Sequence, residues 1–153
     1  MEYKNRQKPS LERWDEIRPE LFGKLTGTGM SEEETVSFLV AAEEMYVNIV
    51  RHGYPKGIGE DSFCETSLSF FEDAEGRYAV ISFIDNGTAF DPLSVPEREP
   101  VTSVRGLKPG GFGIGIARDK TDKLEYMRDG EYNHLSMTKR INKNGGDHGI
   151  QSK

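Results

Sequence analysis

The hydrophobic pattern in the first part of the chain has the spacing of a helix. Apolar residues recur every three or four positions after Pro9-Ser10, at Leu11, Trp14, Ile17, Leu21, Phe22 and Leu25. This spacing predicts an amphipathic helix that begins after the proline. Pro19 lies within the pattern and favours a kink or a break, because proline removes a backbone donor. Gly27 and Gly29 are expected to end the helix.

A second, longer helix is predicted next. Ser31 and Glu34 have the spacing of a capping box, in which the serine hydroxyl accepts from a first-turn N–H and the glutamate reaches back. The helix should run to about Arg51, where Gly53 and Pro55 close it. Its apolar residues lie nearly all round the axis, so we expect it to be largely buried.

Strand-like segments then occur in pairs. Residues 63–71 and 77–84 are rich in alternating or β-branched side chains, and a turn sequence between them predicts a hairpin. Residues 124–127 and 134–141 predict a second hairpin, and residues 2–6 a short edge strand. Paired strands that follow segregated helices predict an α+β fold, a two-layer α/β sandwich with the helices on one face of a mixed sheet.

The chain between the two hairpins is irregular. Residues 91–109 carry four prolines and little periodicity, and a loop of this length in a compact domain is usually functional or disordered. Residues 113–120 can form a short helix. We expect residues 1–141 to form a single domain and the polar residues 142–153 to form a flexible tail.

Composition and charge narrow the functional classes. The chain has 153 residues and a net charge of −6, which argues against direct, sequence-independent nucleic-acid binding, because that needs clustered Lys and Arg. No apolar run approaches the roughly 18 residues of a membrane helix, so no membrane partner is expected. A single cysteine and an N-terminus without a signal-peptide pattern indicate the cytoplasm. The three histidines have no metal-ligand spacing, which disfavours a structural metal cage.

The second helix carries a candidate catalytic pair. Glu44 and Asn48 lie about 40° apart around the helix axis, on a face that they share with the small residues Ser37 and Ala41. Glu43 points elsewhere. A carboxylate on a buried helix is costly unless it is paired or ligating. The Asn48 oxygen suits Mg²⁺, and Glu44 could deprotonate a hydroxyl or water that faces a phosphate. A solvated helix face is the alternative interpretation.

Two later segments suit a nucleotide. Asp85 follows an apolar strand, where its carboxylate could accept from an exocyclic amine such as adenine N6, and Gly87 lets a flat base approach the backbone. Gly111, Gly113 and Gly115 precede the short helix, and backbone N–H groups there favour an anion. Taken alone, the first segment is a common turn and the second is typical of a flexible loop. Together with the helical pair and in this order, they indicate a split nucleotide site.

As an ordered set, these segments resemble the GHKL (Bergerat-fold) ATPases, and within them the small anti-sigma factor serine/threonine kinases. The resemblance is carried by residues 42–55, 84–92, 110–116 and 122–141. It implies ATP and Mg²⁺ as ligands. By this resemblance Asn48 binds the metal, Glu44 is the catalytic base, and Asp85 reads adenine with Gly87 in the same motif.

The resemblance also assigns the phosphate side of the site. Gly111, Gly113 and Gly115 match the phosphate-loop glycines. The proline-rich segment takes the place of the ATP lid, where Arg105 or Lys108 could meet the terminal phosphate. We expect this lid to be mobile without nucleotide and to close over ATP.

One pair departs from the family pattern. Many relatives support the adenine-reading Asp with the hydroxyl of a Gly-Thr pair, whereas Tyr132-Asn133 stands there in this chain. The Asn133 side chain could make a similar hydrogen bond.

The function implied by the resemblance is an ATP-dependent serine/threonine protein kinase of the anti-sigma type. Such a protein phosphorylates a STAS-type anti-anti-sigma partner and sequesters a regulator, for which a sigma factor is the candidate. A homodimer is left open. The sequence shows no phospho-accepting histidine segment ahead of the domain, which disfavours a histidine kinase. Two alternatives remain: a nucleotide-gated binding module without kinase activity, and a stand-alone hydrolase.

Overall fold

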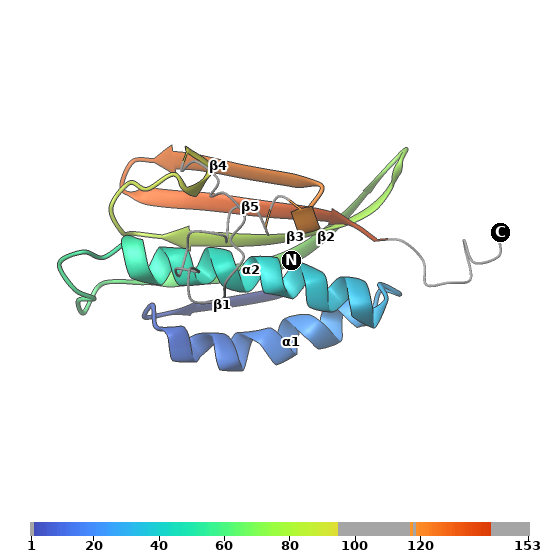
Figure 1. The fold of residues 1–153 in the computed structure, drawn as a ribbon, viewed down its shortest axis with the longest axis horizontal. Coiled ribbons are helices and arrows are strands. Elements are labelled where there is room, and N and C mark those ends of the chain that lie inside the picture. Colours follow the sequence, from blue (N-terminus) through green and yellow to red (C-terminus); the bar gives the residue numbers. More distant parts are fainter. Residues whose placement is uncertain (1, 95–116, 118, 142–153) are drawn as a thin grey trace, which may run out of the picture.

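The computed structural model describes residues 2–94, 117 and 119–141. In this part of the chain two long helices cover one face of a five-stranded sheet, which makes two layers (Figure 1). The elements are β1 (Tyr3–Gln7), α1 (Trp14–Thr26), α2 (Glu32–His52), β2 (Cys64–Asp73), β3 (Gly76–Asp85), β4 (Lys123–Asp129) and β5 (Tyr132–Arg140). Short 3₁₀ turns occur at Leu11–Arg13 and Pro92–Ser94. The predicted α+β sandwich, its edge strand and both hairpins are confirmed.

The strand order is β1-β2-β3-β5-β4, and each of the four pairings in the described residues is antiparallel. The prediction of a mixed sheet is therefore wrong. Two helices, not one, separate β1 from β2, and because successive elements alternate in direction, β2 returns antiparallel to β1. The last hairpin inserts β5 between β3 and β4. This places Asn133 opposite Asp85, at the end of β3.

Helix α1 runs without a break across Pro19. The proline lies in the second turn of the α-helix, so the lost donor costs one backbone bond near the helix start. The predicted apolar stripe packs into the core, except for Leu11, which is 44% exposed on the preceding 3₁₀ turn. Gly27 caps the C-terminal end, as predicted.

Helix α2 begins at the predicted cap, where Ser31 Oγ accepts from the Glu34 N–H at 3.1 Å. It ends at His52, and Gly53 caps it. Most of its apolar residues are buried or half-buried, as expected, but Val36 and Val40 are each 41% exposed. In a two-layer sandwich the outer side of a helix has no third layer to cover it.

An aromatic cluster in the core fixes α2 against the sheet. The Tyr46 ring lies 5.4 Å from the Trp14 ring of α1 and 6.0 Å from the Phe83 ring of β3, measured between centroids. The Tyr46 hydroxyl donates to the Ser10 carbonyl at 2.8 Å. Because Tyr46 comes two residues before Asn48, this cluster also fixes the position of Asn48 relative to the end of β3.

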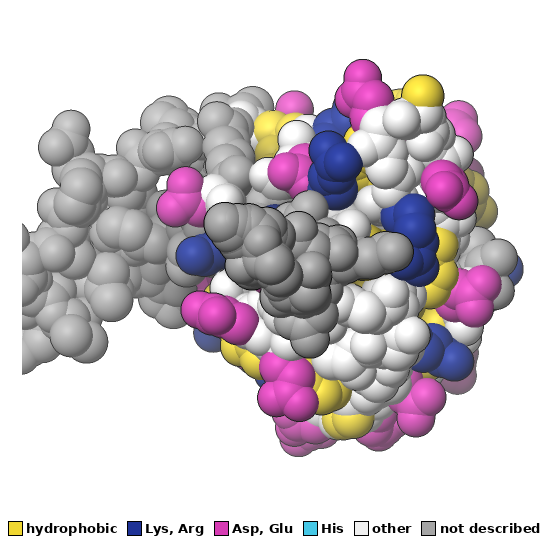
Figure 2. Space-filling model, turned by 90° about the vertical axis from the view of Figure 1, so that its right-hand side faces the viewer, with side chains coloured by type: hydrophobic (Ala, Val, Ile, Leu, Met, Phe, Trp, Pro, Cys, Tyr) yellow, Lys and Arg dark blue, Asp and Glu magenta, His cyan; other side chains and the backbone are white. Residues whose placement is uncertain are grey.

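The surface of the described residues is mixed in charge. On the face seen in Figure 2, acidic and basic side chains are interspersed, and the described part of this face has no continuous basic area of the kind that binds a nucleic-acid backbone. No helix in the described residues is long and apolar enough to cross a membrane.

Several predictions fall on residues 95–116, 118 and 142–153, which lie outside the described part of the chain. These are the glycine run with Gly111, Gly113 and Gly115, the lid with Arg105 and Lys108, and the tail. Of the predicted helix over 113–120, Ala117, Asp119 and Lys120 are described, and they are helical. The division into one domain and a tail stays a prediction.

Candidate functional site

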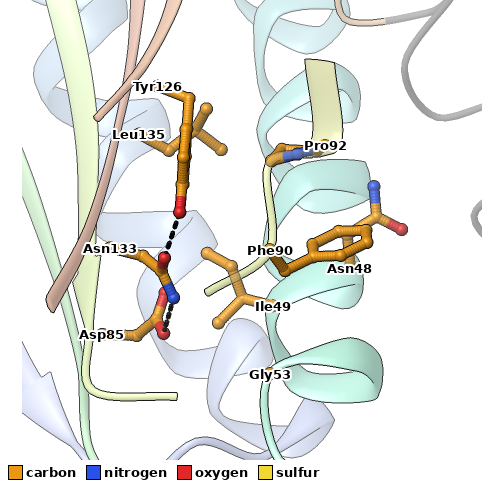
Figure 3. Close-up of a pocket in the computed structure, with 9 residues that line it drawn as sticks. All are labelled: Asn48, Ile49, Gly53, Asp85, Phe90, Pro92, Tyr126, Asn133 and Leu135. Carbon is orange, nitrogen blue, oxygen red and sulfur yellow. Dashed lines mark hydrogen bonds between the residues drawn. The ribbon is translucent and has the colours of Figure 1, made fainter. Parts of the chain in front are cut away.

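A pocket lies between the C-terminal half of α2 and the ends of β3 and β5 (Figure 3). It brings together Asn48 and Asp85, which are 37 positions apart in the sequence. Glu44 lies one turn before Asn48 on α2, and it is not among the residues that line this pocket. The lining residues are Asn48, Ile49, Gly53, Asp85, Phe90, Pro92, Tyr126, Asn133 and Leu135.

Asp85 sits at the base of the pocket and is only 2% exposed. Its Oδ1 accepts two hydrogen bonds at 2.9 Å, from the Gly87 N–H and from Asn133 Nδ2. Because both bonds fall on one oxygen, the described residues leave the second carboxylate oxygen for a ligand. Burial raises the pKa of Asp85, while the bonds from Asn133 and Gly87 and the nearby charge of Arg128 oppose this rise.

Asn133 holds Asp85 as part of a larger network. Its Nδ2 also donates to the Thr88 carbonyl at 2.9 Å. Its Oδ1 accepts from the Tyr126 hydroxyl and from Arg128 Nη1, the latter at 3.2 Å. The hydrogen bond expected of Asn133 is thus confirmed. All its polar groups are engaged, so the amide has one orientation and fixes the carboxylate beside it.

A glycine is needed at position 87 because the backbone of Gly53 lies close to it. The sequence suggested another reason, the approach of a flat base. A Cβ on Gly87 would lie 2.9 Å from the carbonyl carbon of Gly53 and 3.0 Å from its Cα. The Thr88 N–H also donates to the Gly53 carbonyl at 2.7 Å. Glycine is therefore needed for the loop after β3 to pack against the end of α2. This close approach closes one side of the pocket.

Asn86 has a role that the sequence did not suggest. Its Oδ1 accepts from the Tyr54 hydroxyl and from the Phe63 N–H, both at 3.0 Å, and its Nδ2 donates to the Asp61 carbonyl at 2.8 Å. These bonds hold the loop between α2 and β2 against the end of β3. The middle residue of the Asp-Asn-Gly motif therefore stabilises the scaffold around its neighbour.

Asn48 places a buried side-chain oxygen at the pocket. Asn48 is 2% exposed, and its Oδ1 has no hydrogen-bond partner among the described residues. A buried oxygen without a donor is costly, and it is a suitable ligand for a hard cation such as Mg²⁺. The described residues contain no group of three or more His, Cys, Asp or Glu that could hold a metal. A metal here would therefore share Asn48 with ligand and water oxygens.

Glu44 and Glu43 differ as the helical geometry predicts. Glu43 is exposed, whereas Glu44 is half-buried. Burial raises the pKa of Glu44, and the charge of Glu43 adds to this, while Arg51 opposes it. A carboxylate with a raised pKa accepts a proton more readily than an ordinary glutamate does.

The sequence prediction missed much of the apolar lining. Ile49 follows Asn48 directly, but its burial is also explained by the core. Tyr126 and Leu135 carry only the alternation of a strand, which gives no signal of a ligand. Phe90 and Pro92 lie in the irregular segment between the two hairpins, where no periodicity marks a residue that lines a pocket.

The sequence is similar to a protein family and to a known kinase. A family model described as "Histidine kinase-like ATPase domain" matches residues 9–139. The "Serine/threonine-protein kinase BtrW" of Bordetella bronchiseptica is 27% identical over 99 residues, which cover 65% of this chain and 66% of that protein. The match thus spans just under two thirds of the length of this relative.

A solved structure is similar in fold. It is the crystal structure of the RsbU and RsbW domains of Rv1364c from Mycobacterium tuberculosis, with a TM-score of 0.58 and 15% identity. The likeness covers 93% of this chain and 33% of that chain. At this identity the comparison supports the two-layer architecture alone.

Proposed function

Because the chain belongs to the histidine kinase-like ATPase domain family, we propose that it is an ATP-dependent protein kinase that phosphorylates a Ser or Thr of a STAS-type anti-anti-sigma protein. The observation that supports the proposal is the convergence of Asp85 and Asn48 on one pocket, each with a side-chain oxygen to which the described residues donate no hydrogen bond. The similarity to a protein named a serine/threonine-protein kinase supports the choice of acceptor.

The adenine base and the phosphates of ATP would occupy different parts of this site. The second oxygen of Asp85 would accept a hydrogen bond from the N6 amine of adenine. Guanine presents a carbonyl oxygen at that position, and this oxygen would be repelled by the carboxylate because both groups are acceptors. Asn48, which lies about one and a half turns before Gly53 along α2, would share Mg²⁺ with the phosphates. Bound Mg²⁺ neutralises phosphate charge. Gly111, Gly113, Gly115, Arg105 and Lys108 remain the proposed phosphate contacts.

Glu44 would be the base of the transfer step. The hydroxyl oxygen of the partner attacks the terminal phosphorus of ATP, and the hydroxyl proton passes to the Glu44 carboxylate. The bond from that phosphorus to the bridging oxygen breaks, and ADP leaves with the electron pair. Since phosphoryl transfer depends mostly on positioning and charge neutralisation, the protein's task is to hold the reactants in line beside this carboxylate.

We expect Asn48→Ala to remove the effect of Mg²⁺ on ATP affinity. The variant should bind ATP equally with Mg²⁺ and with EDTA, whereas the wild-type protein should bind more tightly with Mg²⁺. Calorimetric titration under both conditions measures this. Asn5→Ala is the matched control, because Asn5 Oδ1 is also buried without a partner but lies on β1. A retained Mg²⁺ effect in Asn48→Ala would remove Asn48 from the metal site.

We expect Asn133→Ala to weaken ATP binding by about 5- to 30-fold, the equivalent of about 1–2 kcal/mol for losing the donor that orients Asp85. Asn133→Thr should recover part of this affinity, because a hydroxyl can donate to the same oxygen. Fluorescence titration with a labelled ATP analogue measures both. Ser136→Ala is the control on the opposite face of β5, and an equal loss there would show a general effect on the strand.

Transfer of labelled phosphate tests the kinase directly. The protein is incubated with γ-labelled ATP and the STAS proteins encoded near it, and we expect acid-stable label on a Ser or Thr of one of them. A stable complex without label would instead favour the nucleotide-gated binding module. Steady phosphate release without a partner would favour the hydrolase.

A further inference from the structure

The pocket at Asp85 is too small for a purine. Its volume is about 20 Å³, which is room for about one water molecule, and Asp85 at its base is only 2% exposed. A bicyclic base is many times larger than a water molecule. If a base is to reach Asp85, at least one wall of the pocket has to move.

Most walls of the pocket are fixed. Asp85 and Asn133 are held by the hydrogen bonds described above, and the Tyr126 hydroxyl is bonded to the same network. Ile49 is 8% exposed on α2, and Leu135 is 3% exposed on β5. Displacing these side chains would break this hydrogen-bond network or disrupt the close packing of the core.

Two lining side chains come from neither α2 nor the sheet: Phe90 and Pro92, on the segment that follows β3. Figure 3 shows them on the α2 side of the pocket, across from Asp85 and Asn133. The described contacts of the Phe90 ring include a stack on His52, with centroids 4.9 Å apart and planes at 24°. His52 is itself exposed, so this contact is weaker than a buried aromatic pair.

We infer that the Phe90 ring is a displaceable plug of the base pocket. It closes the pocket when no nucleotide is bound, and it leaves its seat on His52 when a base enters to reach Asp85. The inference rests on the proposed nucleotide site, and it adds a residue that controls access to that site. The measured affinity for nucleotide is then reduced by the fraction of molecules in which the plug is closed.

The test compares Phe90→Ala with wild type. Removing the ring should tighten the binding of adenosine and of ATP by the same factor, about tenfold if an open state of about 10% becomes dominant. Binding of inorganic tripolyphosphate, which has no base, should not change. Phe71→Ala is the matched control: this ring is stacked on Tyr78 at 4.8 Å, and it lies on β2 far from Cys64, the register partner of Asp85.

The outcomes separate the plug from the proposed function. Weaker adenosine binding in Phe90→Ala would show that the ring is a wall that contacts the base, and unchanged binding would show that it obstructs nothing. Either result overturns the plug and leaves the nucleotide site intact. If neither the wild-type protein nor Phe90→Ala binds ATP, the proposed function fails together with the plug.

A second measurement needs no variant. In wild-type protein, proton cross-relaxation between the Phe90 and His52 rings should be present without ligand and lost when adenosine is saturating. Cross-relaxation that persists at saturation would contradict the displacement of the ring.

Discussion

Replacing Glu44 with glutamine should slow phosphoryl transfer by about 10²- to 10⁴-fold, the usual contribution of a general base, and leave Mg·ATP affinity nearly unchanged. Glutamine keeps the size and shape of the side chain and cannot accept the proton. Single-turnover transfer to the STAS partner gives the rate, and calorimetry gives the affinity. An equal loss of rate and affinity would mean that Glu44 binds nucleotide and does not act as a base.

Glu43→Gln is the matched control for this variant. Glu43 is the exposed neighbour, and its charge helps to raise the pKa of Glu44, so its removal should shift the pH profile toward lower pH with little change in the maximal rate. Since Glu44 accepts a proton only when ionised, wild-type activity should rise with pH through its raised pKa. A profile that is flat through the range of carboxylate titration would contradict this role.

Asp85→Asn should weaken ATP binding by about 10- to 150-fold without unfolding the protein. The asparagine oxygen can still accept from Gly87 and Asn133, but its NH₂ group would meet the adenine amine donor to donor. Loss of a hydrogen bond to a charged group costs about 1.5–3 kcal/mol, which gives this range in Kd. Titration with ATP measures the change, and an undiminished affinity would mean that the adenine base binds elsewhere.

The difference in stability between wild type and Asp85→Asn should depend on pH in a defined direction. Burial raises the folded-state pKa of Asp85, so its stabilising contribution is present below the unfolded-state pKa and is lost as pH rises through the folded-state pKa. Above that range the buried charge costs stability, and asparagine removes the cost. The melting temperature of Asp85→Asn should therefore equal or exceed that of wild type at pH 7, and the difference should shrink near pH 4, about the pKa of a free aspartate.

The sequence predicted the elements well because their signals are local. The Ser31 cap, the end of α2 at Gly53 and both hairpins follow from side-chain spacing and turn residues. The antiparallel order of the whole sheet was missed, since it depends on how two helices return the chain to β1. The exposed valines of α2 were missed for a similar reason, because periodicity does not show which side of a helix lacks a neighbour.

For the site, sequence patterns selected the polar residues and left out the scaffold around them. Asn48, Asp85 and Glu44 stand out as polar groups next to apolar elements, and the structure brings the first two to one pocket. The network of Asn133 with Tyr126 and Arg128 depends on strand register, which no local pattern fixes. Phe90 lies in an irregular segment, so its place in the pocket had no periodic signal at all.

If α2, β3 and β5 together form a site for Mg·ATP, calorimetric titration of the wild-type protein with ATP, with and without Mg²⁺, will show it. We expect saturable binding that is tighter with Mg²⁺ and strongly weakened in Asp85→Asn. The absence of adenine-nucleotide binding, or binding that is indifferent to both Mg²⁺ and Asp85, would contradict the presence of this site.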